Sequence, residues 1–532
     1  MEEVQFAGAV STSDPYNYRQ AIQADDSERW KEATLAEYNT LLQNGTWEIV
    51  DLPPGEKAIG SSWVFRIKRH SDGSIERYKA RIVAQGCSQR PGRDFIEVHV
   101  PTPRPATIRT TFAIAAAEDL ELRSVDISAA FTNGDLDEYI YMRQPEGFHE
   151  GGPHKVCRLK KSLYGLKQAA RQWNIKLHSA LTEMGFKRVE ADRSVYIYSD
   201  GHVRIFVPIY IDDITFACKD GAAIDRAVKQ LATHFKCRDL GATEFLLGVG
   251  ITRDRKTCSI ALHQRQFILD ILERYNMSDC SPVLTPMLPG LVLTKEMGAS
   301  SPEDVEFMRN VPYLSCIGSL QYLASMTRSD IAQVVAYLAR FNSNPGPKHW
   351  AAVKHLLRYL KGTLEHKLHY SGKLGLDMFT TYSDASHGDC KDTGRSTGGY
   401  VTLMAGGAIG WSSKLQGIVA LSTTEAEFIA AVEAGKEIAW MRNLLREFGY
   451  PISTPSVLHM DNQSAISVSK NPEHHGRMKH LDLRFYWLRD AVNDKMITPS
   501  FVPTTEQVAD ILTKPLPAAQ VQFCREQMGI YP

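Results

Sequence analysis

Two adjacent aspartates, Asp212 and Asp213, are the residues of this 532-residue chain whose types and spacing most directly indicate chemistry. Apolar and β-branched residues flank the pair on both sides, from Arg204 to Cys218. This pattern predicts two strands joined by a tight turn that carries the acids. Adjacent carboxylates repel each other, and Mg²⁺ or Mn²⁺, which prefer oxygen ligands, are the usual compensation. The alternative is an ordinary acidic turn.

Other acids lie at the ends of further predicted elements. Asp126 ends the strand 120–126, Asp384 follows the strand 379–383, and Asp461 follows the strand 457–460. Glu427 lies on a helix that begins near residue 423, and Asp510 lies in the last helix. Two-metal phosphoryl transfer requires carboxylates that converge from separate elements. We therefore expect one site with Asp126, Asp212 and Asp213, and a second site with Asp384, Glu427, Asp461 and Asp510.

Within the second set, the choice between Glu425 and Glu427 has a physical basis. Ser422 and Glu425 form a capping-box pattern, which gives Glu425 a structural role at the start of the helix. Glu427 lies about 200° further around the helix, and this leaves it free for a metal ion. Asp461 has a structural alternative, because an aspartate before 462–465 could cap that helix.

The elements that must position these acids follow from periodicity and turn residues. Helices are expected at 27–42, 107–118, 161–185, 222–235, 313–341 and 348–364. A hairpin is expected from 62–68 and 78–84, and further strands in 244–262. The buried set of the first helix is expected to be Trp30, Ala33, Leu35, Tyr38, Leu41 and Leu42. A second α/β pattern begins near residue 377.

Composition bounds the class of protein. The hydrophobic fraction of 43% and the length of 532 residues are typical of a globular chain with several domains. No apolar run of about 18 residues predicts a membrane span. The nine cysteines form no Cys-x-x-Cys pair, and the start lacks a secretory signal, so an intracellular protein is expected, in a cytoplasmic particle or the nucleus. The net charge is zero, but 53–109 and 154–188 are basic and could neutralise phosphates.

Three other motifs are rejected. Asp392-Thr-Gly394 has the letters of an aspartic protease, but its flanks are polar rather than apolar strands. Gly248 and Gly250 lack the third glycine of a dinucleotide loop. The group His474, His475, His480 and Asp482 has no cysteine nearby and no convincing zinc spacing.

Seven segments, in this order, resemble copia-type LTR retrotransposon polyproteins from about residue 27 onward. The polymerase-like segments are 124–135, 141–148, 162–168 and 210–213, and the RNase H-like segments are 422–428, 461–465 and 509–516. The resemblance implies an α+β fold in which a right-handed polymerase (fingers, palm and thumb) precedes an RNase H-like α/β domain. The expected division is a polar leader (1–26), fingers and palm (27–262), a helical thumb or connection (263–372) and the RNase H-like domain (373–532).

The resemblance also implies the activity. It predicts an RNA-directed DNA polymerase with a fused RNase H, two Mg²⁺ or Mn²⁺ ions in each site, and an RNA template, a primer, deoxynucleoside triphosphates and an RNA–DNA hybrid as partners. Full polyproteins also carry capsid, protease and integrase regions, none of which is recognised before residue 27, so this sequence is expected to be a C-terminal portion. The alternative is a catalytically inactive or domesticated nucleic-acid-binding remnant, against which the complete set of acids argues.

Roles for individual residues follow from the same resemblance. Asp126 and Asp212 are expected to be direct metal ligands, and Asp213 is included although successive strand residues point to opposite faces. Lys79 and Arg81 could hold triphosphate oxygens, or they are a solvated strand edge. The segment 162–168 is expected under the template and nucleotide, with Gly165 permitting close backbone approach. Phe131, which follows Asp126 by five residues, is expected near the sugar, or is simply core. Lys160, Lys167 and Arg171 are expected to contact the nucleic-acid backbone.

Overall fold

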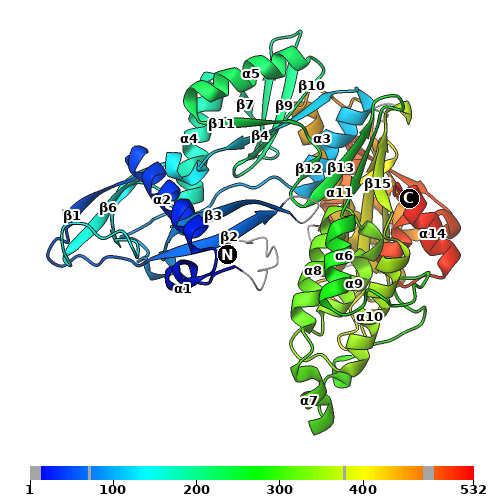
Figure 1. The fold of residues 1–532 in the computed structure, drawn as a ribbon. Helices are drawn as coiled ribbons and strands as arrows, with labels where there is room; N and C mark the ends of the chain where they lie inside the picture. The colour runs from blue at the N-terminus through cyan, green and yellow to red at the C-terminus, as the bar shows by residue number, and fades with distance from the viewer. Residues whose placement is uncertain (1–13, 70–73, 375–378, 471–483) are drawn as a thin grey trace.

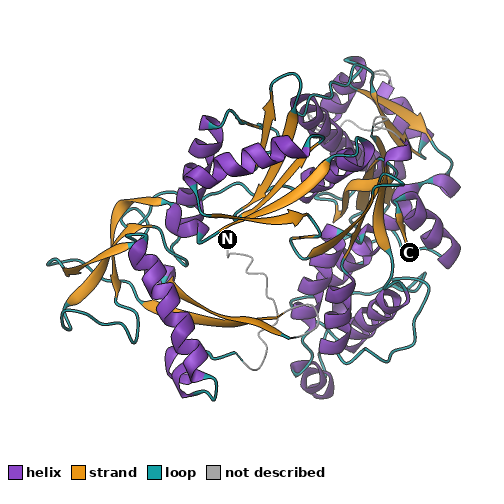
Figure 2. Cartoon of the chain, turned by 45° about the horizontal axis from the view of Figure 1, so that its top comes forward, coloured by secondary structure: helices purple, strands orange, loops and turns teal. Residues whose placement is uncertain are grey.

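The computed structural model of the protein describes residues 14–69, 74–374, 379–470 and 484–532. Figure 1 shows an N-terminal lobe, a second lobe built on a large sheet, a bundle of helices, and a C-terminal α/β unit beside that bundle. Figure 2 shows that helices cover the large sheets. We call the four parts the fingers, the palm, the thumb and the C-terminal unit. The expected α+β fold is confirmed.

The fingers combine a three-stranded sheet, a long hairpin and two helices. Their elements are α1 (Tyr18–Gln23), α2 (Ser27–Gln43), β1 (Trp47–Asp51), β2 (Ser61–Arg69), β3 (Ile75–Ala84), β5 (Asp135–Arg143) and β6 (Lys155–Lys161). Strands β2 and β3 pair antiparallel as expected from the sequence, and β6 lies between β1 and β5. Trp30 of α2 packs edge-on against Phe65 and Tyr78, with ring centroids 5.2 and 4.6 Å away, so the helix is fixed on the hairpin.

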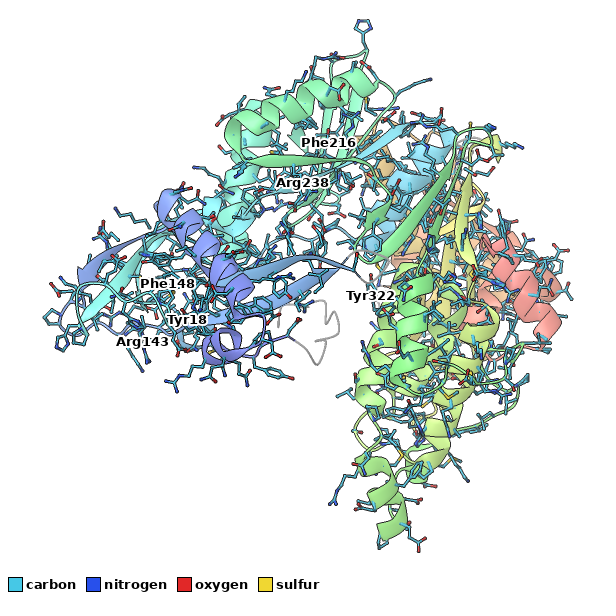
Figure 3. All side chains as sticks on the ribbon, viewed as in Figure 1. Tyr18, Arg143, Phe148, Phe216, Arg238 and Tyr322 are labelled. Atoms are coloured by element: carbon cyan, nitrogen blue, oxygen red, sulfur yellow. The ribbon has the colours of Figure 1, made fainter. Side chains whose placement is uncertain are left out.

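Two expectations for this region are wrong. Part of the expected polar leader is folded, since Ala21 of α1 is buried and Tyr18 stacks on Trp63 with a centroid distance of 6.1 Å. In Figure 3, Tyr18 and Phe148 are labelled side by side. Leu35 and Leu42 of α2 are 51% and 41% exposed, because only one face of this helix meets the hairpin.

The palm is built on a six-stranded antiparallel sheet with the strand order β11-β4-β10-β9-β8-β7. Its elements are α3 (Pro105–Ala117), β4 (Glu121–Ile127), α4 (Ala169–Glu183), β7 (Lys187–Arg188), β8 (Val195–Ser199), β9 (Arg204–Tyr210), β10 (Asp213–Cys218), α5 (Gly221–His234) and β11 (Cys237–Ala242). Helices α4 and α5 share one hydrophobic cluster with the sheet, and α3 shares another. Helix α4 begins at Ala169 and not at residue 161 as expected, because 162–168 form turns in which Gly165 has a φ of +86°.

The thumb is helical, and a five-stranded sheet joins it to its neighbours. The helices are α6 (Arg265–Arg274), α7 (Pro302–Arg309), α8 (Tyr313–Met326), α9 (Ala332–Ala339) and α10 (Pro347–Gly362). The single helix expected at 313–341 is wrong: Arg328 and Asp330 interrupt it with a buried ion pair of 2.7 Å. The sheet has the order β12 (Phe245–Leu246), β13 (Val249–Asp254), β14 (Ser259–His263), β15 (Lys367–Ser371) and β21 (Ile530–Tyr531).

The C-terminal unit is a mixed sheet with the strand order β18-β17-β16-β19-β20. Its elements are β16 (Thr380–Ser386), β17 (Thr397–Met404), β18 (Gly407–Leu415), α11 (Thr423–Glu447), β19 (Ser456–Met460), α12 (Gln463–Lys470), α13 (Arg484–Asn493), β20 (Ile497–Phe501) and α14 (Ala518–Gln527). Strands β16, β17 and β18 are antiparallel, whereas β19 and β20 run parallel to β16. This is the RNase H-like arrangement expected from the sequence. None of the helices in the described residues is long and apolar enough to cross a bilayer.

Palm, thumb and C-terminal unit share one continuous hydrophobic core. Arg109 of α3 crosses their junction. Its Nε donates to the Ile409 carbonyl of β18 (2.8 Å), and its Nη1 donates to the Ser325 and Met326 carbonyls of α8 (2.7 and 3.0 Å). The guanidinium also lies 3.7 Å from the ring centroid of Trp411. The C-terminal unit is therefore packed directly onto the palm as well as onto the thumb.

Candidate active sites

The palm turn that carries the adjacent aspartates is a two-residue hairpin turn. Tyr210 at the end of β9 pairs with Asp213 at the start of β10, so Ile211 and Asp212 form the turn itself. Ile211 has a φ of +59°, in the left-handed region that a β-branched residue rarely enters. The hairpin expected from the sequence is confirmed, and its tip places two carboxylates at the edge of the palm sheet.

Asp126 meets this tip from the neighbouring strand. It is the direct partner of Asp213 in the antiparallel register of β4 and β10. Residues opposite each other in an antiparallel pair project from the same face, so Asp126 and Asp213 share a face. Successive residues of a strand point to opposite faces, but Asp212 belongs to the turn and not to the strand. This alternation therefore does not argue against Asp213 as a ligand.

Burial and mutual repulsion outweigh the nearby positive charges at Asp212 and Asp213. Burial, and then the charge of Asp126, raise the pKa of Asp212. Burial, and then Asp212 and Asp126, raise the pKa of Asp213 to about 6. Among the described residues, no Lys or Arg nitrogen lies within the 4.0 Å of an ion pair from any of these three carboxylates. The carboxylates are thus held together at an electrostatic cost that a bound cation would remove.

The fingers hairpin presents its basic residues toward this tip. Arg81 and Lys79 both act on the Asp212 carboxyl by lowering its pKa, although burial outweighs them. Burial, and then the neighbouring Arg81 and Lys68, lower the pKa of Lys79 to about 8. The Arg81 guanidinium lies 4.4 Å from the ring centroid of Tyr164. Lys79 and Arg81, the two expected triphosphate ligands, are therefore both near enough to Asp212 for their charges to lower its pKa.

The expected nucleotide-binding residues on the palm side differ in their surroundings. Phe131 is half-buried and contacts Tyr164 edge-on, with a centroid distance of 5.2 Å. A Cβ at Gly165 would lie 2.2 Å from the Ala84 carbonyl, so this glycine is required by the approach of its own chain to β3. Lys167 is exposed, and its backbone N–H donates to Gln89 Oε1 (2.8 Å).

Several other charged residues of this region are engaged with the protein. Asp135 and Asp137 lie in β5 and contact α4: Asp135 pairs with Lys176 (2.8 Å), and Asp137 accepts from Gln172 (3.2 Å). The Lys160 ammonium pairs with Glu48 (2.6 Å), and Arg171 pairs with Glu97. Lys160 and Arg171, which were expected to contact a nucleic-acid backbone, are therefore already paired with acids in the structure.

A second group of carboxylates lies in the C-terminal unit. Oxygens of Asp384, Glu427 and Asp461 come within 4.8 Å of one another, and theirs is the one such group of three in the described part of the chain. They come from β16, α11 and the end of β19, respectively. The acids Asp126, Asp212 and Asp213 do not approach one another as closely as this group.

Local structure leaves these acids available for a ligand. Glu425 accepts from the Leu421 N–H (2.8 Å), so it caps the start of α11 as expected. In a standard capping box the donor would be the N–H of Ser422, one residue later. Asn462, not Asp461, caps α12 by accepting from the Ala465 N–H (2.9 Å). Burial, and then Asp384 and Asp461, raise the pKa of Glu427 well above its usual range. Its buried Oε2 has no hydrogen-bond partner, which fits a metal ion.

Asp510 is not one of the three acids of this group, and it forms an ion pair with Lys514. It lies in a short 3₁₀ helix, Val508–Leu512, and not in the last helix as expected. Burial, and then Asp384, raise its pKa. Lys514 Nζ lies 2.9 Å from Asp510 and 3.6 Å from Asp384, and these acids raise the Lys514 pKa to about 12 against the effect of its burial. Lys514 therefore balances part of the negative charge.

Sequence reasoning missed three partners of the second group. Thr513 donates to the Asp384 carboxylate, and Thr504 donates to Asp461 (2.9 Å). Thr513 and Lys514 stand inside the segment 509–516, three and four residues after Asp510. This spacing corresponds to about one helical turn, and it is the signal that could have found them.

The rejected motifs have ordinary explanations where the structure describes them. Asp392 accepts from the backbone N–H of Lys295 at 3.0 Å, in a turn. Gly248, with a φ of +73°, lies in the turn between β12 and β13. The group of His474, His475, His480 and Asp482 lies outside the described residues.

Comparison with known proteins gives a consistent family. Residues 44–289 match the reverse transcriptase (RNA-dependent DNA polymerase) family. The chain is 40% identical, over 97% of its length, to a retrovirus-related Pol polyprotein from transposon TNT 1-94 of Nicotiana tabacum, of which it covers 39%. It is 37% identical, over 98% of its length, to the Pol polyprotein from transposon RE1 of Arabidopsis thaliana, of which it covers 35%. The chain thus spans well under half the length of these two relatives.

Two further similarities complete the comparison. Over 59% of its length the chain is 34% identical to a transposon Ty5-1 protein of Saccharomyces cerevisiae, and it covers 100% of that protein. Among solved structures, a foamy viral protease–reverse transcriptase in complex with double-stranded DNA matches with a TM-score of 0.45 and 13% identity, covering 89% of this chain and 70% of that one.

Proposed function

Because this chain belongs to the retrovirus-related Pol polyproteins of copia-type LTR retrotransposons, and carries their reverse transcriptase domain, we propose that it copies RNA into DNA at the palm turn and cleaves the RNA of the resulting hybrid at the C-terminal cluster. The observation that carries the proposal is the presence of two separate groups of carboxylates, one at the palm turn and one in the C-terminal unit, in which burial raises the pKa of Asp212, Asp213 and Glu427. A decayed or domesticated remnant would have no reason to keep both groups at this electrostatic cost.

In the polymerase reaction, the primer 3′-hydroxyl attacks the α-phosphorus of a deoxynucleoside triphosphate. Asp126, Asp212 and Asp213 would hold divalent ions, and two Mg²⁺, when bound, would activate the 3′-oxygen and stabilise the pyrophosphate leaving group. The chain's own part is positioning: Lys79 and Arg81 face the tip from the fingers, where they would bind triphosphate oxygens. Stacking on Tyr164 orients the Arg81 guanidinium for this role.

In the nuclease reaction, Asp384, Glu427, Asp461 and Asp510 would hold the ions for hydrolysis of an RNA phosphodiester. Burial, and then Asp384 and Asp461, raise the pKa of Glu427 and so favour its protonated form in the metal-free protein. Ion binding must therefore displace its proton. Thr513 and Thr504 orient the Asp384 and Asp461 carboxylates, respectively, and Lys514 forms an ion pair with Asp510.

The test of the polymerase site is primer extension on an RNA template with Mg²⁺ or Mn²⁺. Asp126→Asn and Asp212→Asn keep the side-chain volume and remove the charge, so extension should fall by orders of magnitude. Asp137→Asn is the matched control, because Asp137 is an exposed acid of β5, in the same part of the chain, that accepts from Gln172. Near-normal extension by both active-site variants would reject the assignment.

The nuclease site needs its own experiment, with a labelled RNA–DNA hybrid. Asp461→Asn should abolish cleavage of the hybrid while primer extension stays largely intact, because Asp461 belongs to the other group of carboxylates. Loss of both activities in a folded variant would show that the two groups do not act separately.

A further inference from the structure

The left-handed turn at Ile211 has a specific restraint. In the described part of the chain, eight non-glycine residues have positive φ, and Ile211 is the only β-branched one among them. A left-handed conformation costs any residue with a Cβ, and it costs most when the Cβ is branched. A two-residue hairpin turn with positive φ at its first position normally has glycine there. Without an additional contact, this turn would relax and move the Asp212 carboxylate.

That contact comes from helix α4. The Trp173 Nε1–H donates to the Ile211 carbonyl at 2.7 Å. The indole is 1% exposed and packs edge-on against Phe235, with ring centroids 5.0 Å apart. The hydrogen bond therefore reaches the half-buried turn from a donor that is held in the hydrophobic core.

The helix that carries Trp173 is itself fixed at the same level. A Cβ at Gly134 would lie 2.8 Å from the Gln172 Cβ and 2.9 Å from the backbone nitrogen of Trp173, so the chain just before β5 packs directly against α4 at this point. The ion pair between Lys176 and Asp135 (2.8 Å) holds the next turn of the helix. The donor thus has little freedom to follow a relaxing turn.

We propose that Trp173 is a positioning residue for the polymerase reaction: its indole N–H holds Ile211 in the left-handed conformation that aims Asp212 at the metal site. The proposal rests on the proposed polymerase function. It assigns to Trp173 no contact with substrate, and it predicts that the need for the indole N–H depends on which residue occupies position 211.

The test is a double-mutant cycle of primer extension on an RNA template. Trp173→Phe keeps an aromatic ring in the core and removes the donor together with part of the ring volume, and the Trp440→Phe control below makes the same change of side chain. Since one hydrogen bond is lost, kcat should fall roughly two- to tenfold, with little change in KM for the primer–template. In an Ile211→Gly background, glycine needs no restraint in the left-handed region, so the further loss on Trp173→Phe should be less than about twofold.

The matched control is Trp440→Phe, which removes an indole N–H of helix α11 that is bonded to the Ala191 carbonyl at 2.9 Å and makes no bond to the palm turn. An equal loss from Trp173→Phe in the wild-type and Ile211→Gly backgrounds would overturn the proposal, as would an equal loss from Trp440→Phe. Hydrogen–deuterium exchange of the peptide 205–218 gives a readout that does not require activity. Exchange should quicken in Trp173→Phe and not in Trp440→Phe, so an inactive wild type with this result would reject the proposed function alone.

Discussion

Asp213 links the polymerase site to the stability of the metal-free protein. Its pKa is raised from 3.8 to about 6 by burial and then by Asp212 and Asp126. This difference corresponds to about 3 kcal/mol of free energy. The folded protein binds the proton more tightly than the unfolded chain, so the stability that Asp213 contributes is fully present below pH 3.8 and is lost as the pH rises through about 6.

The perturbation that tests this linkage is Asp213→Asn. Between pH 5 and pH 8 the ionisation of Asp213 alone should remove about 1.4 kcal/mol from the wild-type free energy of unfolding. Asparagine cannot ionise, so the variant should gain about that much relative to the wild type over the same interval. Burial and the neighbouring Asp212 both disfavour the ionised form of Asp213. The wild type is therefore expected to be less stable than the variant at pH 8.

The assay is urea denaturation in EDTA at pH 5 and pH 8, followed by tryptophan fluorescence. Asp494→Asn is the control, because it removes the same charge from an exposed position. Saturating Mg²⁺ at pH 8 should stabilise the wild type more than the Asn variant, since the ion binds only the folded carboxylates. A variant that is no more stable than the wild type at pH 8, or a difference that does not change with pH, would refute the reasoning.

Single residues elsewhere in the chain give three further predictions. Phe131→Val should raise the efficiency of ribonucleotide relative to deoxynucleotide incorporation on one template; an unchanged ratio in an active variant would show that Phe131 is only core. Glu427→Gln should abolish hybrid cleavage and yet raise the thermal midpoint in EDTA at pH 8, because its raised pKa makes the charged form costly; a lowered midpoint would contradict this. Arg109→Met should destabilise the protein by about 3 kcal/mol, because the buried Ile409 carbonyl and two partly buried carbonyls of α8 lose their donor; Arg104→Met, at a more exposed position, should cost far less in the same denaturation assay.

The local features of both sites could be predicted because they depend on residues close in sequence. The hairpin around Asp212 and the capping role of Glu425 follow from alternation and from a three-residue spacing. Glu427 then remains as the metal candidate on its helix. Each of these conclusions needs only the period of one element.

Features that depend on distant residues could not be predicted in this way. Nothing near Trp173 indicates that its indole contacts Ile211, which is 38 residues away. The interruption of the helix at 313–341 depends on the buried pair Arg328–Asp330, whose surroundings include Thr363 and Tyr359. The expected start of α4 was wrong for a similar reason, since the turn at Gly165 is dictated by the contact with β3.

The hydrogen bonds of Arg109 to both α8 and β18 have a consequence for the distance between the two proposed active sites. In the described part of the chain the palm and the C-terminal unit share a hydrophobic core, and the sheet from β12 to β21 joins elements that precede and follow the thumb helices. The separation between Asp212 and Asp384 is therefore fixed by packed side chains. A hybrid that passes from the palm acids to the C-terminal acids would therefore span a fixed distance. The RNA would then be cut a constant number of nucleotides behind the growing DNA end.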